Sequence, residues 1–173
     1  NEAFLIDEET RNIIVNSDPN SGLHIKPVFR GREIEKYFSK PSGSYIIATL
    51  PSKKLEIETL PGIENYLSQF GQSKLEQSGN INSRKKTANK WFETQDAIAF
   101  WQEFAKPKLI WKRIGSKLRF TYDESGFYAL DSTCIATGDH LKYLVGVLNS
   151  KLIDFELNRF APKTGTGDLI ISV

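Results

Sequence analysis

Residues 106–152 constrain the fold more than any other stretch, because they join short strand-forming runs to one strongly apolar helix. Four runs are rich in β-branched and aromatic side chains and are separated by glycines or turn residues: 109–111, 118–122, 127–128 and 134–136. Apolar residues then recur at spacings of three and four, which is typical of one helix face: Leu141, Leu144, Val145, Leu148, Leu152 and Phe155. We therefore predict a long scaffold helix over residues 139–160, with Asp139 as its N-cap, behind a basic and aromatic β-surface.

The rest of the chain adds shorter elements to this pattern. Strands are expected at three places: residues 3–6, 45–50 and 169–173. Helices are expected at three others: residues 8–15, 61–76 and 95–104. Residues 78–89 are polar and basic without periodicity, and loops of this length are usually functional or disordered. A length of 173 residues fits one domain, or two small lobes that share a core.

The sequence also limits where the protein acts. No apolar run approaches the ~20 residues that a membrane span needs, so we expect no membrane partner. We expect no signal peptide, because the chain does not begin with a basic region followed by an apolar stretch. One cysteine forms no internal disulfide, which fits a cytoplasmic location. The first residue is Asn rather than Met, which suggests a fragment of a longer protein.

Charge is distributed unevenly along the chain. The net charge is only +2, but residues 79–120 carry 10 lysines and arginines against 3 aspartates and glutamates. The flanking segments are mildly acidic. A basic segment of this kind is typical of a positively charged surface that binds phosphates. A solvated, lysine-rich face would look the same, and both interpretations stay open on composition alone.

Arg30 and Arg32 flank Gly31, which places two guanidinium groups on a bendable backbone. Guanidinium groups bind phosphate oxygens or the edge of a guanine in bidentate fashion. Alternatively, the two arginines pair with Glu33 and Glu35 in a surface cluster. The residues alone favour this second interpretation.

Catalytic chemistry is scarce in the sequence. One Cys and two His cannot supply the four ligands of a zinc site. Cys134 lies in an apolar run and is interpreted as a buried structural thiol, with His140 on the surface. The Gly165-Thr166-Gly167 segment lacks the lysine of a phosphate-binding loop and precedes a strand. We therefore predict no catalytic, cofactor-binding or metal-binding residues in this chain.

Seven short segments, taken in order, resemble one known family. They are AFLID at 3–7, IKP at 25–27, RGREI at 30–34, KWFE at 90–93, KPKLI at 106–110, FTYD at 120–123 and LKYLVGVLNSKL at 141–152. Together they resemble the TaqI-like C-terminal specificity domain, the target-recognition domain of adenine-N6 DNA methyltransferases. The same module occurs in type IIG restriction–modification enzymes, which fuse endonuclease, methyltransferase and recognition parts. The resemblance covers nearly the whole chain.

The resemblance implies an α+β fold, a β-rich DNA target-recognition lobe with packed helices that hold it against a catalytic domain. It implies one specificity domain, residues 1–173, at the C-terminal end of a larger bacterial methyltransferase. The partners would be double-stranded DNA and the methyltransferase domain of the same parent chain, which flips out the target adenine. S-adenosylmethionine would bind that missing domain and not this chain. Two departures matter: the segment after residues 61–76 varies in the family, and the domain is expected to continue slightly beyond residue 171.

Physical reasoning and the resemblance together predict a DNA-binding set. Phosphate contacts give affinity and base-edge contacts give specificity. Six residues are candidates for phosphates: Lys85, Lys86, Lys90, Lys112, Lys117 and Arg119. Four are candidates for base edges: Arg30, Arg32, Arg84 and Arg113. Three aromatic residues have two possible roles, packing beside sugars or bases of DNA or packing in the core, and the core is favoured for each: Trp91, Trp111 and Tyr122.

A single DNA-binding surface requires that these residues converge. Residues 78–89 and the turn at Arg30 to Arg32 must both lie beside residues 112–119. The alternative function is a protein-interaction module whose basic block binds an acidic partner. A small-molecule enzyme is a third class, which converging carboxylates in a pocket would favour.

Overall fold

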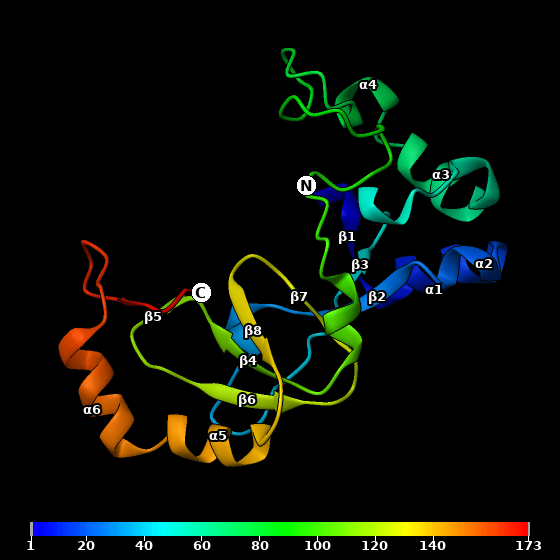
Figure 1. Ribbon diagram of the computed structural model, residues 1–173. Helices are drawn as coiled ribbons and strands as arrows, with labels where there is room; N and C mark the ends of the chain where they lie inside the picture. The colour runs from blue at the N-terminus through cyan, green and yellow to red at the C-terminus, as the bar shows by residue number, and fades with distance from the viewer. Residues whose placement is uncertain (1, 173) are drawn as a thin grey trace. The chain divides into compact units, whose positions relative to one another are not determined.

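Contacts divide the chain into two units, and the computed structural model describes residues 2–172 of it (Figure 1). The first unit contains the residues up to Pro27 together with Gly43–Phe100. The second contains Val28–Ser42 together with the residues from Trp101 onward. Within the described residues, no helix is long and apolar enough to cross a membrane. The following paragraphs treat each unit by itself.

The first unit combines a small antiparallel sheet with short helices. Strands β1 (Leu5–Ile6) and β2 (Ile25–Phe29) both pair with β3 (Tyr45–Ile47), and Leu5 and Lys26 share Ile46 as their partner in register. The α-helices are α1 (Glu8–Ser17), α2 (Pro19–Gly22), α3 (Pro61–Ser68) and α4 (Gln72–Leu75). The 3-10 helices are η1 (Glu2–Phe4), η3 (Pro51–Lys53) and η4 (Ile57–Thr59). The core is mostly aliphatic and includes Ile14, Ile47, Ile63 and Leu67.

Local sequence explains how the helices of this unit begin. The carboxylate of Asp7 accepts the amide of Thr10 at 2.9 Å and caps α1, whose first turn is acidic. The carboxylate of Asp18 caps α2, where Pro19 takes a position whose N–H needs no partner. These two caps fix where both helices begin.

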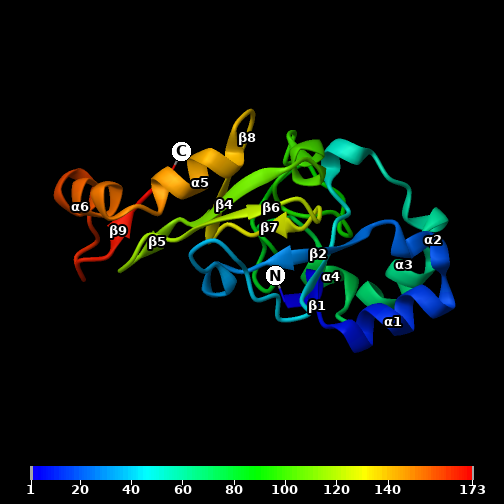
Figure 2. The same ribbon diagram turned by 90° about the horizontal axis from the view of Figure 1, so that it is seen from below.

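The second unit is built on an antiparallel sheet with β4 in its centre. Strand β4 (Lys108–Lys112) lies between β6 (Phe120–Asp123) and β8 (Thr133–Thr137). The end of β2 pairs in parallel with β7 (Tyr128–Ala129), and β5 (Ile114–Gly115) pairs with β9 (Leu169–Ile170). The helices are η2 (Gly31–Glu33), η5 (Trp101–Ala105), α5 (Leu141–Leu148) and α6 (Lys151–Phe160). Helix α5 packs on β4 and β6 (Figure 2) and covers a core that includes Trp111 and Phe120. The mixture of helices and small sheets confirms the α+β fold class.

The long scaffold helix predicted over residues 139–160 is wrong, because Asn149 and Ser150 divide it into α5 and α6. The side chain of Asn149 leaves the helix and pairs with the backbone of Phe120. It accepts the Phe120 amide at 3.0 Å and donates to the Phe120 carbonyl at 2.7 Å. Ser150 then caps α6 by accepting the amide of Ile153. Asp139 is not the N-cap of α5, because that position is taken by His140, whose φ of 56° is left-handed.

Other predicted elements differ in extent. The helix expected at residues 61–76 is interrupted before Gly71, whose φ of 82° does not fit a helix. The helix expected at 95–104 is wrong, because only the 3-10 turn η5 forms at its end. The helix expected at 8–15 is confirmed and extends to Ser17. The strands expected at 3–6 and 45–50 shorten to β1 and β3. The strand expected at 169–173 shortens to β9 within its described part, and residue 173 lies outside the described residues.

Asn149→Ala is expected to lower the free energy of unfolding by about 2 kcal/mol, because two hydrogen bonds are lost and the Phe120 amide and carbonyl stay buried. Urea unfolding followed by tryptophan fluorescence measures the change. Asn158→Ala is the matched control, because the exposed amide of Asn158 bonds only to Asp154 one turn earlier. Equal losses in the two variants would contradict this role of Asn149.

Candidate nucleic-acid interface

The end of β4 and the turn that contains Gly31 lie side by side in the second unit. A Cβ atom on Gly31 would lie 3.1 Å from Cγ of Lys112, and one on Gly115 would lie 3.2 Å from its Cδ. The aliphatic stem of Lys112 is therefore held between two glycines. The predicted convergence of the Arg30 to Arg32 turn with Lys112 is confirmed.

Ser132 ties these two basic segments together. Its hydroxyl accepts the amide of Gly31 at 3.2 Å, and its carbonyl accepts the amide of Arg113 at 3.0 Å. Sequence reasoning missed Ser132, because a serine in a polar turn gives no signal of long-range contacts. Arg32, Lys112 and Arg113 are all exposed and lie on the backbone segments that Ser132 joins, and this set together with Ser132 is called the Ser132 surface.

The structure argues against the acidic cluster that the sequence left open around Arg30 and Arg32. The carboxylate of Glu33 is buried and accepts the hydroxyl of Ser42 and the backbone amide of Arg30. Within residues 2–172, neither arginine takes part in an ion pair. Arg32 is exposed, whereas Arg30 is half-buried and its Nε has no hydrogen-bond partner within the described chain. Arg32 is therefore available to a ligand.

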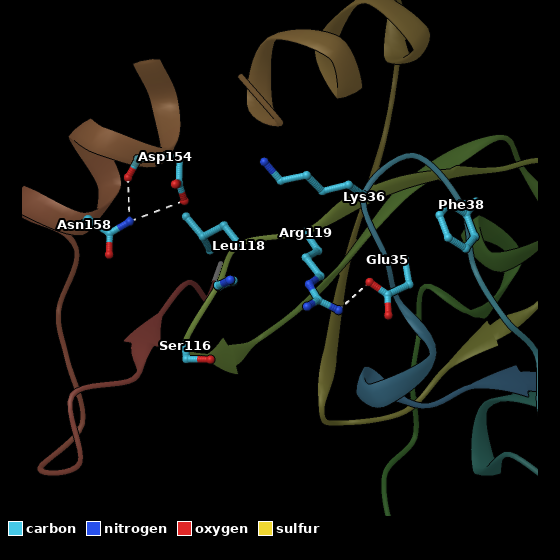
Figure 3. Close-up of a pocket in the computed structure, with 9 residues that line it drawn as sticks. Glu35, Lys36, Phe38, Ser116, Leu118, Arg119, Asp154 and Asn158 are labelled. Atoms are coloured by element: carbon cyan, nitrogen blue, oxygen red, sulfur yellow. Dashed lines mark hydrogen bonds and ion pairs between the residues drawn. The ribbon is translucent and has the colours of Figure 1, made fainter. Parts of the chain in front are cut away.

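A cavity of about 630 Å³ lies between residues 35–38, residues 116–119 and helix α6 (Figure 3). Arg119 points to Glu35 and forms an ion pair with it. The ammonium group of Lys36 donates to the carbonyl of Asn149 at 3.0 Å. Asp154 accepts from Asn158 on the same helix. Lys117 is exposed at this cavity, so it is the cation of this segment that is most accessible to phosphate.

Arg84 is buried in the first unit, although it was predicted to face DNA. Its side chain is only 9% exposed, and three of its nitrogens donate to backbone carbonyls. Nε bonds to Leu75 at 2.6 Å, Nη1 to Glu93 at 2.8 Å and Nη2 to Trp91 at 2.6 Å. Burial lowers the pKa of Arg84. The guanidinium group therefore stabilises the first unit by joining three backbone carbonyls. The prediction that Arg84 reads a base edge is wrong, because these nitrogens already have partners.

The other predicted DNA-binding cations of the first unit are all exposed, and one of them is also paired: Lys85, Lys86 and Lys90. Lys85 and Lys86 are exposed, and Gly79 packs closely on Lys86 with a φ of 76°. Lys90 forms an ion pair with Glu56 at 3.0 Å. The prediction that residues 78–89 lie beside residues 112–119 involves both units and stays a prediction.

The aromatic and sulfur-containing candidates are part of the packing. Trp111 is 8% exposed and its Nε1 donates to the carbonyl of Ile171 at 3.0 Å. Trp91 and Tyr122 are half-buried against the cores of the first and second units. Cys134 is half-buried and its Sγ lies 3.6 Å from the Ile171 carbonyl. Across the described part of the chain, no group of three His, Cys, Asp or Glu residues could hold a metal ion.

Comparisons with known proteins identify the family and a similar fold. The sequence matches none of the curated proteins with which it was compared. The fold is similar to that of the type IIL restriction-modification enzyme MmeI, which was solved in complex with DNA. The TM-score is 0.57 at 12% identity over 98% of this chain and 22% of that one, so this chain spans about a fifth of its length. Residues 26–169, which run through both units, match the TaqI-like C-terminal specificity domain. The chain belongs to the family of TaqI-like C-terminal specificity domains.

Proposed function

We propose that this chain is the DNA target-recognition domain of a restriction–modification enzyme and positions duplex DNA for an adenine-N6 methyltransferase in the same parent chain. The observation that carries the proposal is the Ser132 surface, where Arg32, Lys112 and Arg113 are exposed and their segments are fixed to one another. Its occurrence in a specificity domain supports a role in DNA binding for this basic surface. The similar fold of MmeI, a DNA-bound enzyme, supports the same conclusion.

The exposed cations have different roles in this proposal. Arg32 and Arg113 read base edges, because a guanidinium group can bind a guanine in bidentate fashion. Lys112 and Lys117 bind phosphates and fix the register, and Lys85 and Lys86 do so from the first unit. Lys90 and Arg119 already have carboxylate partners, so they contribute less. Arg30 is half-buried and supports the turn.

The parent enzyme supplies what this chain lacks. We assign S-adenosylmethionine and the chemistry of methyl transfer to the methyltransferase domain of that enzyme, and we assign no cofactor residue to this chain. Residues 1–173 would form one recognition domain at the C-terminal end of the parent. A restriction–modification system that acts on cellular DNA would work in the cytoplasm.

Duplex binding is expected to weaken steeply as salt rises, because bound lysines and arginines release counterions from DNA. Lys117→Ala is expected to weaken binding equally on all sequences and to reduce the salt slope by about 1. Arg113→Ala is expected to relax specificity at one base pair, at a cost of about 1–3 kcal/mol. Fluorescence anisotropy on a pool of labelled duplexes at several salt concentrations measures both effects.

Lys151→Ala, which removes an exposed charge from α6 outside the Ser132 surface, is the control. A duplex affinity that does not change with salt concentration would contradict the proposal. A duplex affinity that is unchanged in Lys112→Glu and Arg113→Glu would contradict it as well. Competition by polyglutamate as strong as that by DNA at matched salt would instead identify a module for an acidic protein partner.

A further inference from the structure

The chain after α4 folds back on itself in a narrow loop, which we call the 76–87 loop (Figure 1). Backbone hydrogen bonds join its two arms. The amide of Arg84 donates to the carbonyl of Glu76 at 2.9 Å, and the amide of Gly79 donates to the carbonyl of Arg84 at 3.0 Å. The arms pack closely, because a Cβ atom on Gly79 would lie 2.9 Å from Cβ of Lys86. The loop is therefore a hairpin of two paired arms.

The base of the 76–87 loop is fixed by one buried polar side chain on each arm. On the first arm, Gln77 is 5% exposed, and its Nε2 donates to the carbonyls of Lys90 at 3.2 Å and Glu93 at 3.1 Å. Its Oε1 accepts the hydroxyl of Thr87 at 2.7 Å. On the second arm, the guanidinium group of Arg84 binds three backbone carbonyls. Buried polar groups with satisfied hydrogen bonds rigidify their surroundings, so the arms hold the tip in a defined place.

A tight turn forms the tip of the loop. The amide of Ser83 donates to the carbonyl of Asn80 at 3.0 Å, and its hydroxyl donates to the same carbonyl at 2.9 Å. The two central residues of this turn are Ile81 and Asn82. Asn82 has a φ of 68° at the third position, where a type II turn needs a positive φ and asparagine is tolerated. The turn therefore places Ile81 and Asn82 next to each other at the end of the loop.

The side chains at the tip are unusually accessible. Ile81 is 93% exposed, which is the largest exposed fraction of the large apolar side chains within residues 2–172, and Tyr143 follows at 72%. Asn82 is exposed as well. An apolar side chain that a fixed turn holds in water gains free energy when a partner covers it. The tip therefore has the features of a contact point.

The charge around the tip indicates which partner fits. Residues 77–92 contain four lysines and arginines and no aspartate or glutamate. Lys85 and Lys86 are both exposed and follow the tip along the second arm. Duplex DNA matches this arrangement, because its phosphates flank grooves that present apolar methyl groups and hydrogen-bonding base edges. The major groove is about 12 Å wide and admits a two-stranded ribbon, so two paired arms can enter it.

Resting on the proposed function, we propose that Ile81 and Asn82 read one A·T base pair in the major groove. An asparagine amide binds N6 and N7 of adenine in bidentate fashion, and an apolar side chain contacts the C5-methyl group of thymine. The two neighbouring side chains at the tip thus match the two bases of one pair. Lys85 and Lys86 bind phosphates beside this pair and contribute affinity, whereas the tip contributes specificity.

Uracil substitution tests the contact of Ile81. Duplexes that the wild type selects from a random pool are made again with uracil in place of thymine at each selected A·T pair in turn, which removes only the C5-methyl group. At one pair, wild-type affinity is expected to fall about fourfold, the value of one buried methyl group. Ile81→Ala is expected to lose this difference and to keep the wild-type salt slope, because no phosphate contact is removed. Ile13→Ala, which truncates an exposed isoleucine of α1 in the same unit, is the matched control and is expected to keep the difference.

A second selection tests Asn82. Asn82→Gly removes the amide and keeps the turn, because glycine adopts a positive φ readily. Its preference for adenine at the same pair is expected to fall about tenfold. Asn82→Asp replaces the amide donors with acceptors and is expected to favour cytosine there. Asn16→Ala, on the exposed side of α1, is the control and is expected to select the wild-type sequence. Urea unfolding is expected to show wild-type stability for Ile81→Ala and Asn82→Gly.

The outcomes separate this inference from the function on which it rests. A thymine preference that Ile81→Ala retains in full would overturn the reading of the A·T pair. Selection of the wild-type sequence by Asn82→Gly would overturn it too. Either result would leave the proposed function standing, because the wild type would still select a sequence. A wild type that selects no sequence from the pool would contradict the proposed function and this inference with it.

Discussion

Lys108→Met is expected to lower the free energy of unfolding by about 3–5 kcal/mol, because it leaves a buried carboxylate without its counterion. The ammonium group of Lys108 lies 2.5 Å from Oδ2 of Asp123, and the two side chains are 0% and 5% exposed. The same ammonium donates to the carbonyl of Phe104 at 2.7 Å. In the variant, the backbone amide and hydroxyl of Ser125 still donate to the Asp123 carboxylate. Urea unfolding followed by tryptophan fluorescence measures the loss, because Trp101 and Trp111 both lie in the second unit.

A double variant shows whether the loss comes from the unpaired charge. Lys108→Met/Asp123→Leu removes both charges and is expected to be more stable than Lys108→Met alone. Lys106→Met is the matched control, because Lys106 forms an exposed pair with Glu103, and its stability is expected to stay close to that of the wild type. A loss below about 1 kcal/mol in Lys108→Met would contradict this account, because ordinary surface changes produce losses of that size.

This ion pair also connects the core to the candidate interface. Lys108 and Asp123 are directly paired in the register of β4 and β6. A shift by one residue would separate them and turn every side chain of β4 to the opposite face. Lys112 ends the same strand and Arg113 follows it. A buried charge pair at one end of β4 thus helps to fix where the basic side chains at its other end lie.

The strands of the second unit could be predicted because their signal is local. The runs at 109–111, 118–122 and 134–136 become β4, β6 and β8 with small shifts at their ends. The break between α5 and α6 could not be predicted in this way. Asn149 ends α5 through hydrogen bonds to Phe120, which is distant in sequence. A tertiary contact of this kind overrides the apolar periodicity that continues through the break.

The helix prediction for residues 95–104 is wrong for a different reason. Ile98, Trp101 and Phe104 recur every third residue, and this spacing fits a 3-10 helix as well as it fits an α-helix. The 3-10 helix η5 forms only from Trp101, and Ile98 has a φ of 43°, which an α-helix does not allow. Periodicity over so few residues does not separate the two structures.

The basic block could be predicted, but the use of each of its cations could not. Lys108 is neutralised by a buried carboxylate, Arg119 pairs with Glu35, and Arg84 is bound to carbonyls. In a count of charged residues, these three cations are not distinguished from the exposed Lys112 and Arg113. Only the three-dimensional contacts distinguish a cation that holds the fold from one that faces a ligand.

Arg84→Ala is expected to lower the free energy of unfolding by about 3 kcal/mol, because three carbonyls lose their donor and two of these hydrogen bonds are buried. Arg84→Lys is expected to recover only part of this loss. A single ammonium group cannot serve three diverging carbonyls as the planar guanidinium group does. Urea unfolding followed by tryptophan fluorescence, in a Trp101→Phe/Trp111→Phe background that leaves Trp91 of the first unit, measures both changes.

Lys85→Ala separates the structural role of Arg84 from a DNA-binding one, because Lys85 is the adjacent exposed cation. Its stability is expected to stay close to that of the wild type, while its affinity for duplex DNA falls with a reduced salt slope. Arg84→Lys keeps the charge, so at a temperature where it is fully folded its salt slope is expected to equal that of the wild type. If Arg84→Ala instead kept the stability of the wild type and lost specificity at one base pair, Arg84 would be a residue that reads DNA.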